Sequence, residues 1–257
     1  MADRGSPATS GPILREDDEG LSLDFDNGTV QSRMVAADPA RLVLEYTRLM
    51  MGFLLFQPVP ARIAMIGLGG GSLARYCRRK LAQADFTAVE ISPQVIALRD
   101  AFGIPPDGAR FRVLCADGAA FVRDNGQPFD VLLVDGFDRD GQPPQLCTPA
   151  FYDCCRERLA ADGVLVVNLH GDDPAHDVCI DRIRAAFETR IVVIAAENSA
   201  NSVVFAGSDT PFPPPFAELV ARLRALEAAH PVGLGATLSK IVRYAERRPP
   251  RRRRSGA

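Results

Sequence analysis

The stretch MIGLGGGSLARY, residues 65–76, decides the fold of this chain. A run of apolar residues leads directly into glycines, and an amphipathic helical pattern begins at Ser72. Glycines let the backbone turn sharply and approach a ligand without a Cβ in the way, and the start of the helix offers free N–H groups. The pattern predicts a ligand-binding loop, with a plain strand-to-helix turn as the alternative. The loop glycines are Gly67, Gly69, Gly70 and Gly71.

The alternation of strand and helix continues from this loop to residue 207. Such alternation predicts a doubly wound, mostly parallel sheet. Only five residues, ENSAN, separate the last two strands, which is too short for a crossover, so they should pair antiparallel. We therefore expect an α/β fold with a Rossmann-like, class I methyltransferase-type sheet of seven strands. The expected strands are 62–67, 85–91, 111–117, 129–137, 163–169, 190–196 and 202–207.

The composition changes on both sides of this core and suggests five segments. Leu21, Leu23 and Phe25 alternate with polar residues before an Asp-Asn-Gly turn, which predicts an N-terminal β-hairpin. An apolar helix over 41–56 should follow it. The predicted segments are a disordered 1–20, the hairpin and helix at 21–57, the cofactor-binding core at 58–210, a helical 211–245 and a basic, disordered tail at 246–257.

Charge and composition exclude several classes. The formal net charge of −2 creates no global field that favours nucleic acid or a membrane. No apolar run reaches roughly 18 residues, so no transmembrane helix is expected. The six cysteines show no CxxC pairing and the N-terminal residues are polar, which predicts reduced thiols and a cytoplasmic location.

Acidic residues follow two of the expected strands on the side where open α/β sheets bind ligands. Glu90 ends the second strand, roughly twenty residues after the glycine loop, where a carboxylate can accept both ribose hydroxyls of a nucleoside. Asp117 and Gly118 end the third strand, where an acid can reach an adenine amino group. Helix capping is the structural alternative for both acids.

The loop after the fourth strand, VDGFDRDG, holds Asp135, Asp138 and Asp140. It should face the same crevice as the glycine loop. A carboxylate there can hold an amine substrate or accept its proton, although a solvated acidic loop is the alternative. Because no nearby histidine has ligand spacing, no metal is expected. His170 is interpreted as a structural loop residue.

Residues 21–207 resemble the spermidine synthase (polyamine aminopropyltransferase) family. The resemblance rests on LDFDNGTVQSR, IGLGGGSLAR, VEISPQVI, ADGAAFV and the segment from VLLVDGFDRDG to GVLVVNL. It implies a homodimer that acts in polyamine biosynthesis on an amine substrate. It also implies a catalytic acid at Asp138, a first loop acid at Asp135, and a cofactor site that includes Gln31, Glu90, Ile91, Asp117, Gly118 and Asp135.

The same comparison of motifs shows departures from the family. Gly70 stands where the family has an aspartate that faces the aminopropyl amine. The loop that begins at Asp135 lacks the family's Asp-Ser-Ser-Asp-Pro pattern. The family's tyrosine-histidine or tyrosine-glutamine pair falls near Leu42 and Val43. The cofactor half of the site therefore matches the family, whereas the acceptor half differs.

Three functions are compatible with these patterns. The first is aminopropyl transfer from decarboxylated S-adenosylmethionine to an amine, with Asp138 holding and deprotonating the amine. The second is a methyltransferase that uses intact S-adenosylmethionine, because an aspartate that would repel the cofactor's carboxylate is missing at Gly70. The third is a non-catalytic protein that binds a nucleoside or keeps only the fold. Total motif coverage favours the first.

Overall fold

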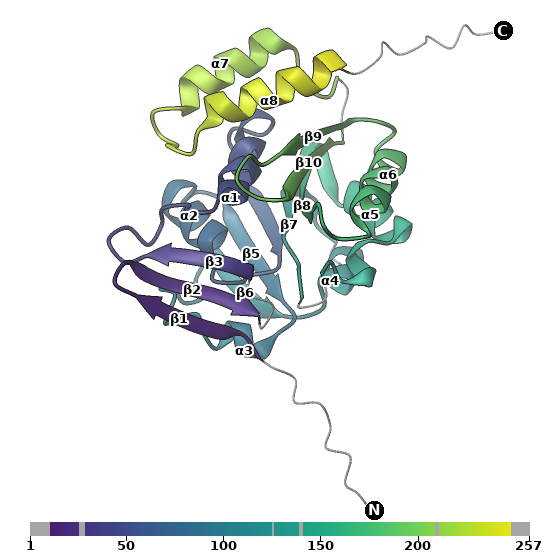
Figure 1. The fold of residues 1–257 in the computed structure, drawn as a ribbon. Coiled ribbons are helices and arrows are strands. Elements are labelled where there is room, and N and C mark those ends of the chain that lie inside the picture. The colour runs from purple at the N-terminus through teal and green to yellow at the C-terminus, as the bar shows by residue number, and fades with distance from the viewer. Residues whose placement is uncertain (1–10, 26–28, 125, 139–140, 209–210, 248–257) are drawn as a thin grey trace, which may run out of the picture.

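The computed structural model describes residues 11–25, 29–124, 126–138, 141–208 and 211–247. At its centre is a seven-stranded sheet with the order β6-β5-β4-β7-β8-β10-β9 (Figure 1). The strands from β4 to β8 pair in parallel, and β10 pairs antiparallel with both β8 and β9. The expected seven-stranded, mostly parallel sheet is confirmed. The strands are β4 Arg62–Ile66, β5 Asp85–Glu90, β6 Phe111–Cys115, β7 Phe129–Val134, β8 Leu159–His170, β9 Ile191–Ala195 and β10 Asn201–Gly207.

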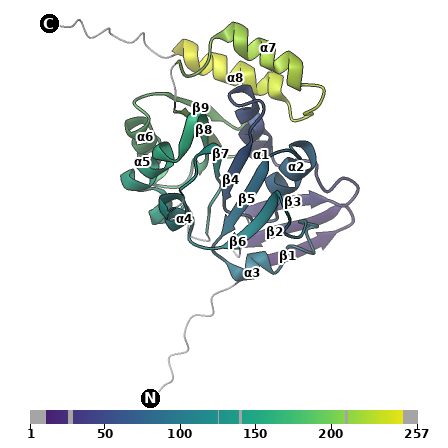
Figure 2. The ribbon, with the colours of Figure 1, turned by 180° about the vertical axis from the view of Figure 1, so that it is seen from behind.

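Apolar side chains cover both faces of the central sheet because successive strand residues point to opposite sides. In β7, Val131 and Leu133 pack on one face, while Leu132 and Val134 pack on the other. The second face is covered by α4 (Gly118–Asp124), α5 (Pro149–Glu157) and α6 (His176–Ala186). The first is covered by α1 (Glu45–Met50), the 3-10 helix η1 (Met51–Leu55) and α2 (Ser72–Lys80) (Figure 2). Two short helices, α3 (Pro93–Ile96) and η2 (Pro144–Leu146), complete the loops.

The helix expected over residues 41–56 is shorter and changes its winding. It begins at Glu45 and becomes the 3-10 helix η1 at Met51. The Arg48 guanidinium donates hydrogen bonds to the carbonyl oxygens of Leu42 and Val43. A side chain thus binds carbonyl groups that would otherwise accept helical N–H groups, which explains why residues 41–44 stay outside the helix.

The N-terminal segment forms the expected β-hairpin and adds a third antiparallel strand before it. The strands are β1 (Ile13–Asp17), β2 (Gly20–Phe25) and β3 (Thr29–Val35). The prediction of disorder over 1–20 is therefore wrong for β1. Four of its five residues are exposed, so it carries no alternating apolar signal. Its residues are held by backbone pairing to β2. The disorder predicted for 1–10 and 248–257 falls outside the described residues.

The C-terminal segment packs against the far end of the molecule from the three-stranded sheet (Figure 1). It forms α7 (Phe216–Leu226) and α8 (Leu234–Arg247), so the helical region continues two residues past the predicted boundary. Arg222 on α7 donates hydrogen bonds to the carbonyl oxygens of Leu55 and Phe56. The ammonium of Lys240 on α8 lies 3.0 Å from the Ala195 carbonyl oxygen.

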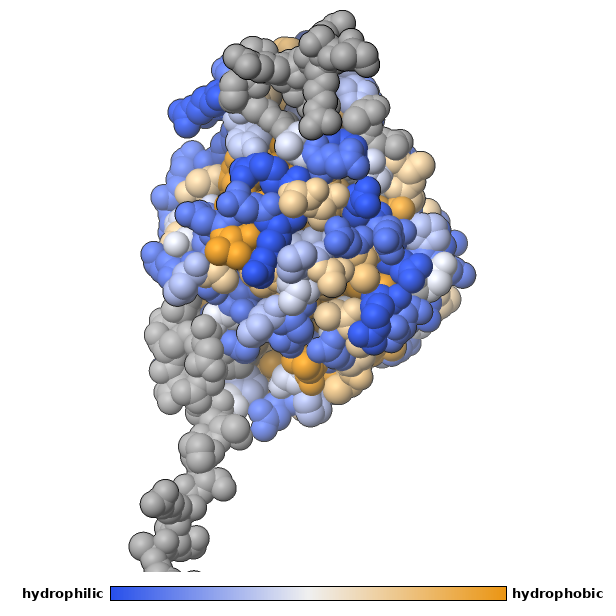
Figure 3. Space-filling view, turned by 90° about the vertical axis from the view of Figure 1, so that its right-hand side faces the viewer, coloured by the Kyte–Doolittle hydropathy of each residue, from blue (hydrophilic) through white to orange (hydrophobic). Residues whose placement is uncertain are grey.

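The surface is mainly hydrophilic on the side that Figure 3 presents, where hydrophobic residues appear as small, separated patches. In the described part of the chain, no helix is both long and apolar enough to cross a membrane. The fold therefore places its large apolar surfaces inside, between the central sheet and its two helical layers.

Candidate active site

Two adjoining cavities lie beyond the carboxyl ends of β4, β5 and β7. The first, which we call the glycine-loop cavity, measures about 300 Å³ and is lined by the loop after β4. The second, the β8–β10 cavity, measures about 520 Å³ and is lined by the ends of β8 and β10. The residues that line both are Gln31, Tyr46, Phe137 and Asp138.

The glycine loop follows β4 with left-handed backbone at three positions. The φ angles are 89° at Gly67, 50° at Gly69 and 70° at Gly71. A Cβ on Gly67 would lie 2.3 Å from the carbonyl oxygen of Asp135, so only glycine fits this close approach between two strand ends. Gly67 and Gly69 line the glycine-loop cavity directly.

Gly70 has a packing role that the sequence did not show. A Cβ at this position would lie 2.7 Å from the Ser32 Cβ and 2.9 Å from the Phe102 ring. The Gly70 N–H donates to the Ser32 hydroxyl at 3.0 Å. Ser32 therefore fills the space beside the loop, and a larger residue at 70 would require the neighbouring side chains to move.

Glu90 lies buried at the end of β5 and lines the glycine-loop cavity. Its Oε2 accepts the Leu68 N–H at 2.9 Å, and its Oε1 accepts the Ser92 N–H at 2.9 Å. The carboxylate thus holds the glycine loop and the start of α3 together. Each carboxylate oxygen can accept a second hydrogen bond, so the capacity to bind two ligand hydroxyls remains.

Asp117 and Gly118 line the same cavity at the end of β6. The Asp117 Oδ1 accepts the Ala120 N–H at 2.7 Å, which is the helix-capping contact that the sequence offered as an alternative. Gly118 is required by packing, because a Cβ there would lie 2.3 Å from Ile66. Ile91 also lines the cavity and is 60% exposed, so its apolar side chain is available to a ligand ring.

Asp135 follows β7 and lines the glycine-loop cavity. Its Oδ1 accepts a hydrogen bond from the Asn168 amide at 2.8 Å. Burial raises the pKa of Asp135 to about 6, while the Asn168 amide and the nearby Tyr46 hydroxyl act in the opposite direction. The carboxyl group therefore titrates just below neutral pH and is mainly ionised above it.

Tyr46 of α1 is a site residue that the sequence analysis missed. Its hydroxyl donates to the Gln31 carbonyl oxygen at 3.0 Å. Burial and the nearby Asp135 charge raise the pKa of Tyr46 well above its usual range. Polar groups of α1 thus reach the cavities from Glu45 and Tyr46, three positions beyond Leu42 and Val43.

Asp138 is exposed and lies where the two cavities meet. Its backbone pairs with Gly141 on the far side of the loop. Asp140, the third acid of the loop, falls outside the described residues. The structure therefore brings Asp135, Asp138 and Gln31 together with the glycine loop.

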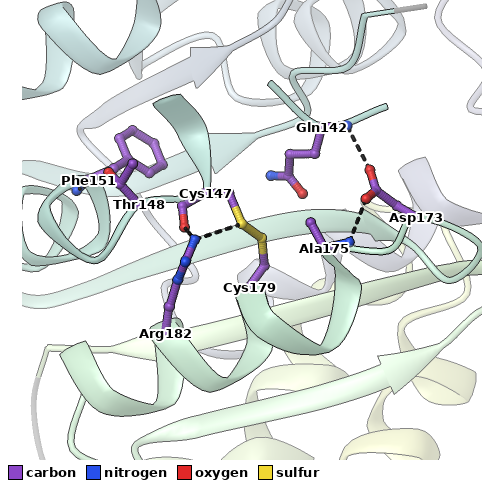
Figure 4. Close-up of a disulfide and its surroundings, with 8 residues drawn as sticks. All are labelled: Gln142, Cys147, Thr148, Phe151, Asp173, Ala175, Cys179 and Arg182. Atoms are coloured by element: carbon purple, nitrogen blue, oxygen red, sulfur yellow. Dashed lines mark hydrogen bonds between the residues drawn. A yellow bond between two sulfur atoms is a disulfide. The ribbon is translucent and has the colours of Figure 1, made fainter. Parts of the chain in front are cut away.

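The loop after Asp138 is anchored to the segment that precedes α6 (Figure 4). Asp173 accepts the Gln142 N–H at 2.8 Å and the Ala175 N–H at 2.7 Å. A disulfide joins Cys147 to Cys179, whose Cα atoms are 5.6 Å apart. The expectation of reduced thiols is therefore wrong for this pair. Two sequence positions 32 residues apart carry no local pairing signal.

Asn168 is the second polar residue that the sequence analysis missed. It interrupts the apolar run of β8, GVLVVNL, and is only 2% exposed. A polar residue inside a buried strand needs a hydrogen-bond partner, and this requirement was a usable signal.

Among the described residues, no group of three or more His, Cys, Asp or Glu could hold a metal ion. His170 lines the β8–β10 cavity.

Comparison with known proteins adds three findings. The spermine/spermidine synthase domain matches residues 43–187. A polyamine aminopropyltransferase of Neisseria meningitidis serogroup A is 40% identical over 210 residues, which are 80% of each chain. Two solved structures share the fold.

The first of these structures is a probable spermidine synthase from Corynebacterium glutamicum, with a TM-score of 0.71 and 23% identity over 88% of this chain and 87% of that one. The second is the human methyltransferase-like protein 13 in complex with SAH, with a TM-score of 0.64 and 22% identity over 83% of this chain and 97% of that one. Aminopropyltransferase-like and methyltransferase-like proteins thus share this architecture, and the fold alone does not separate them.

Proposed function

The chain belongs to the spermine/spermidine synthase family, and from that membership we propose that it transfers an aminopropyl group from decarboxylated S-adenosylmethionine to an amine. The observation that carries the proposal is the meeting of two cavities at the loop after β7. In this arrangement the cofactor occupies the glycine-loop cavity, the amine occupies the β8–β10 cavity, Asp138 lies at their junction, and Asp135 lines the glycine-loop cavity.

The nucleoside part of the cofactor fits the residues around the glycine loop. Glu90 retains two acceptor positions for the ribose hydroxyls, and Asp117 lies beside the position proposed for the adenine amino group. Ile91 offers an exposed apolar side chain to the adenine ring. These roles are supported by the cavity lining and by the order of the motifs along the chain.

The charges around the cavity favour the decarboxylated cofactor. Among its described lining residues are four acids and no arginine or lysine. The tail of intact S-adenosylmethionine carries a carboxylate, which these acids would repel, whereas the decarboxylated tail carries only an ammonium. The acids are Glu90, Asp117, Asp135 and Asp138. Selection against the carboxylate therefore does not require an acid at Gly70.

The chemistry is a displacement at carbon. The lone pair of the amine nitrogen attacks the propyl carbon bonded to the cationic sulfur, and a C–N bond forms while the C–S bond breaks. The electron pair of the broken bond stays on sulfur, which leaves neutral methylthioadenosine. The new ammonium then loses a proton. We assign Asp138 to holding and deprotonating the amine, and Asp135 to orienting it.

Calorimetric titration tests the cofactor assignment. We expect binding of decarboxylated S-adenosylmethionine and of methylthioadenosine, with weaker binding of the intact cofactor. Preference for intact S-adenosylmethionine would favour a methyltransferase. Binding of methylthioadenosine without turnover across a panel of amines would favour a non-catalytic nucleoside-binding protein. Failure to bind any of the three compounds would overturn the proposal.

We also propose a cytoplasmic homodimer, which rests on the resemblance to the family. Analytical ultracentrifugation at several protein concentrations tests the assembly. A sedimentation coefficient of a dimer that persists on dilution is the expected result, and a monomer at all concentrations would contradict it.

A further inference from the structure

Two asparagines from neighbouring strands connect Asp135 to the β8–β10 cavity. The Asn168 Nδ2 donates to the Asp135 Oδ1 at 2.8 Å, and the Asn201 Nδ2 donates to the Asn168 Oδ1 at 3.0 Å. The three side chains come from β8, β10 and the loop after β7. They form a continuous row of hydrogen bonds beside the junction of the cavities.

The register of the strands places the two amides side by side. In the antiparallel pair of β8 and β10, Asn168 lies opposite Val203 and Asn201 lies opposite His170. Residues directly opposite each other in such a pair point to the same face, and so do residues two apart along a strand. The two asparagines are therefore diagonal neighbours on one face of the sheet, and no loop is needed to bring them together.

The direction of the hydrogen bonds follows from chemistry. An ionised carboxylate only accepts hydrogen bonds, so Asn168 must turn its NH₂ group toward Asp135. Its carbonyl oxygen then points the other way and, because Asn168 is buried, it requires a donor. The Asn201 amide supplies this donor. An aspartate at 168 would instead place two carboxylates against each other.

We propose that Asn168 and Asn201 form a positioning relay that fixes the rotamer of Asp135 and keeps it ionised for its contact with the acceptor amine. Neither asparagine is assigned a contact with the reacting atoms. Their effect reaches the reaction through the carboxylate. The part of this inference that concerns the amine rests on the proposed function, while the effect on Asp135 itself does not.

The relay predicts how Asp135 titrates. Besides Asn168, the group in contact with this carboxylate is Tyr46 of α1. The charged and titratable groups lining the same cavity are Glu90, Asp117 and Asp138, and those lining the β8–β10 cavity are Glu45, Arg48, His170, Asp172 and Asp173. Removal of the Asn168 amide takes away the hydrogen bond to the Asp135 Oδ1 and should raise the pKa of Asp135 by about one unit.

The closing experiment measures the protonation of Asp135 in the intact protein. The ¹³C chemical shift of its carboxyl group is followed from pH 4 to pH 8 and is assigned by its absence in Asp135→Asn. We expect the midpoint to rise by about one unit in Asn168→Ala and by a smaller amount in Asn201→Ala. Val203→Ala removes buried packing next to Asn168 and should lower Tm without moving the midpoint.

Activity gives the second readout. The acidic limb of the kcat/KM profile should move with the carboxyl midpoint, and kcat at pH 7 should fall while methylthioadenosine affinity stays unchanged. An unchanged midpoint in both asparagine variants would overturn the relay. A shifted midpoint in a protein whose wild type turns over no amine would uphold the relay and overturn the proposed function instead.

Discussion

The two cavities are built in different ways. The polar groups of the glycine-loop cavity are held by backbone close to them in the chain or in the adjacent strand: Glu90 binds the N–H groups of Leu68 and Ser92, and Asp117 caps its own helix. The β8–β10 cavity is assembled by side chains from distant segments, such as Glu45 of α1, which accepts the N–H groups of residues 197 and 198. The first cavity is a local structure, and the second is a tertiary one.

This difference bears on which half of the site can depart from the family's motifs and keep its shape. A local arrangement is preserved as long as the strand, the turn and the helix keep their sequence, so the motifs proposed to bind the nucleoside resemble those of the family, with Gly70 as the departure. An assembled arrangement can exchange one contributing side chain for another from a neighbouring element. Tyr46 and Asn168 supply polar groups to a half in which the motifs had suggested only losses.

The largest effect is expected from Asp138→Asn. This change should damage only the assembled half of the site, which is the β8–β10 cavity. Loss of a group that holds and deprotonates the amine should lower kcat by about 10²- to 10⁴-fold, with methylthioadenosine affinity unchanged. Steady-state kinetics and calorimetry measure the two quantities. Asp153→Asn, on the exposed side of α5, is the matched control. Equal loss of both quantities would show that the halves are not separable.

Reduction of the disulfide between Cys147 and Cys179 should weaken the assembled half next. The bond closes a loop of 32 residues, so its removal should lower the free energy of unfolding by about 4 kcal/mol. Thermal unfolding with and without a dithiol reductant measures this loss. The exposed Cys115 offers a control, since Cys115→Ser should retain the full response to the reductant.

In the same experiment, KM for the amine should rise more than the dissociation constant of methylthioadenosine. The bond anchors the loop that separates the cavities, whereas the groups proposed to bind the nucleoside are held by hydrogen bonds on other strands. A reductant that leaves both Tm and KM unchanged would contradict a structural role for this disulfide.

Glu90→Gln should damage only the local half of the site, which is the glycine-loop cavity proposed to bind the nucleoside. The amide keeps the shape of the side chain but turns one acceptor into a donor, which faces either a backbone N–H or a ribose hydroxyl. We expect methylthioadenosine affinity to fall by about 10- to 100-fold. If the affinity is unchanged while Tm falls, Glu90 serves the glycine loop alone.

The last expected effect concerns Asp135, which lies between the two halves of the site because it lines the glycine-loop cavity and accepts a hydrogen bond from Asn168 of the β8–β10 cavity. The pKa of Asp135 is raised to about 6 in the folded protein, so the folded state binds the extra proton more tightly than the unfolded state. Stability from this group is present below pH 4 and is lost as the pH rises through 6. Asp135→Asn should therefore gain about 2–3 kcal/mol at pH 8 and little at pH 4. Urea unfolding at several pH values measures the gain, and a gain independent of pH would contradict this explanation.

The difference between local and assembled structure also decides which features of the fold and of the site could be predicted from the sequence. The glycine loop, Glu90 and Asp117 were located because each follows a strand whose end is visible as a break in an apolar run. The parallel part of the sheet followed from the alternation of strands and helices, and the antiparallel pairing of the last two strands followed from the short connection between them. Tyr46 was missed because its contacts with Gln31 and Asp135 are tertiary, and β1 was missed because its residues are mostly exposed. The disulfide and the asparagine pair depend on tertiary proximity, which one sequence does not display.

The central claim is that the group transferred between the two cavities is an aminopropyl group. Mass analysis of the products tests it most directly, after incubation of the protein with an amine and, separately, with decarboxylated or intact S-adenosylmethionine. We expect an amine extended by one aminopropyl group and an equal amount of methylthioadenosine from the decarboxylated cofactor. A methylated product and S-adenosylhomocysteine from the intact cofactor would contradict it.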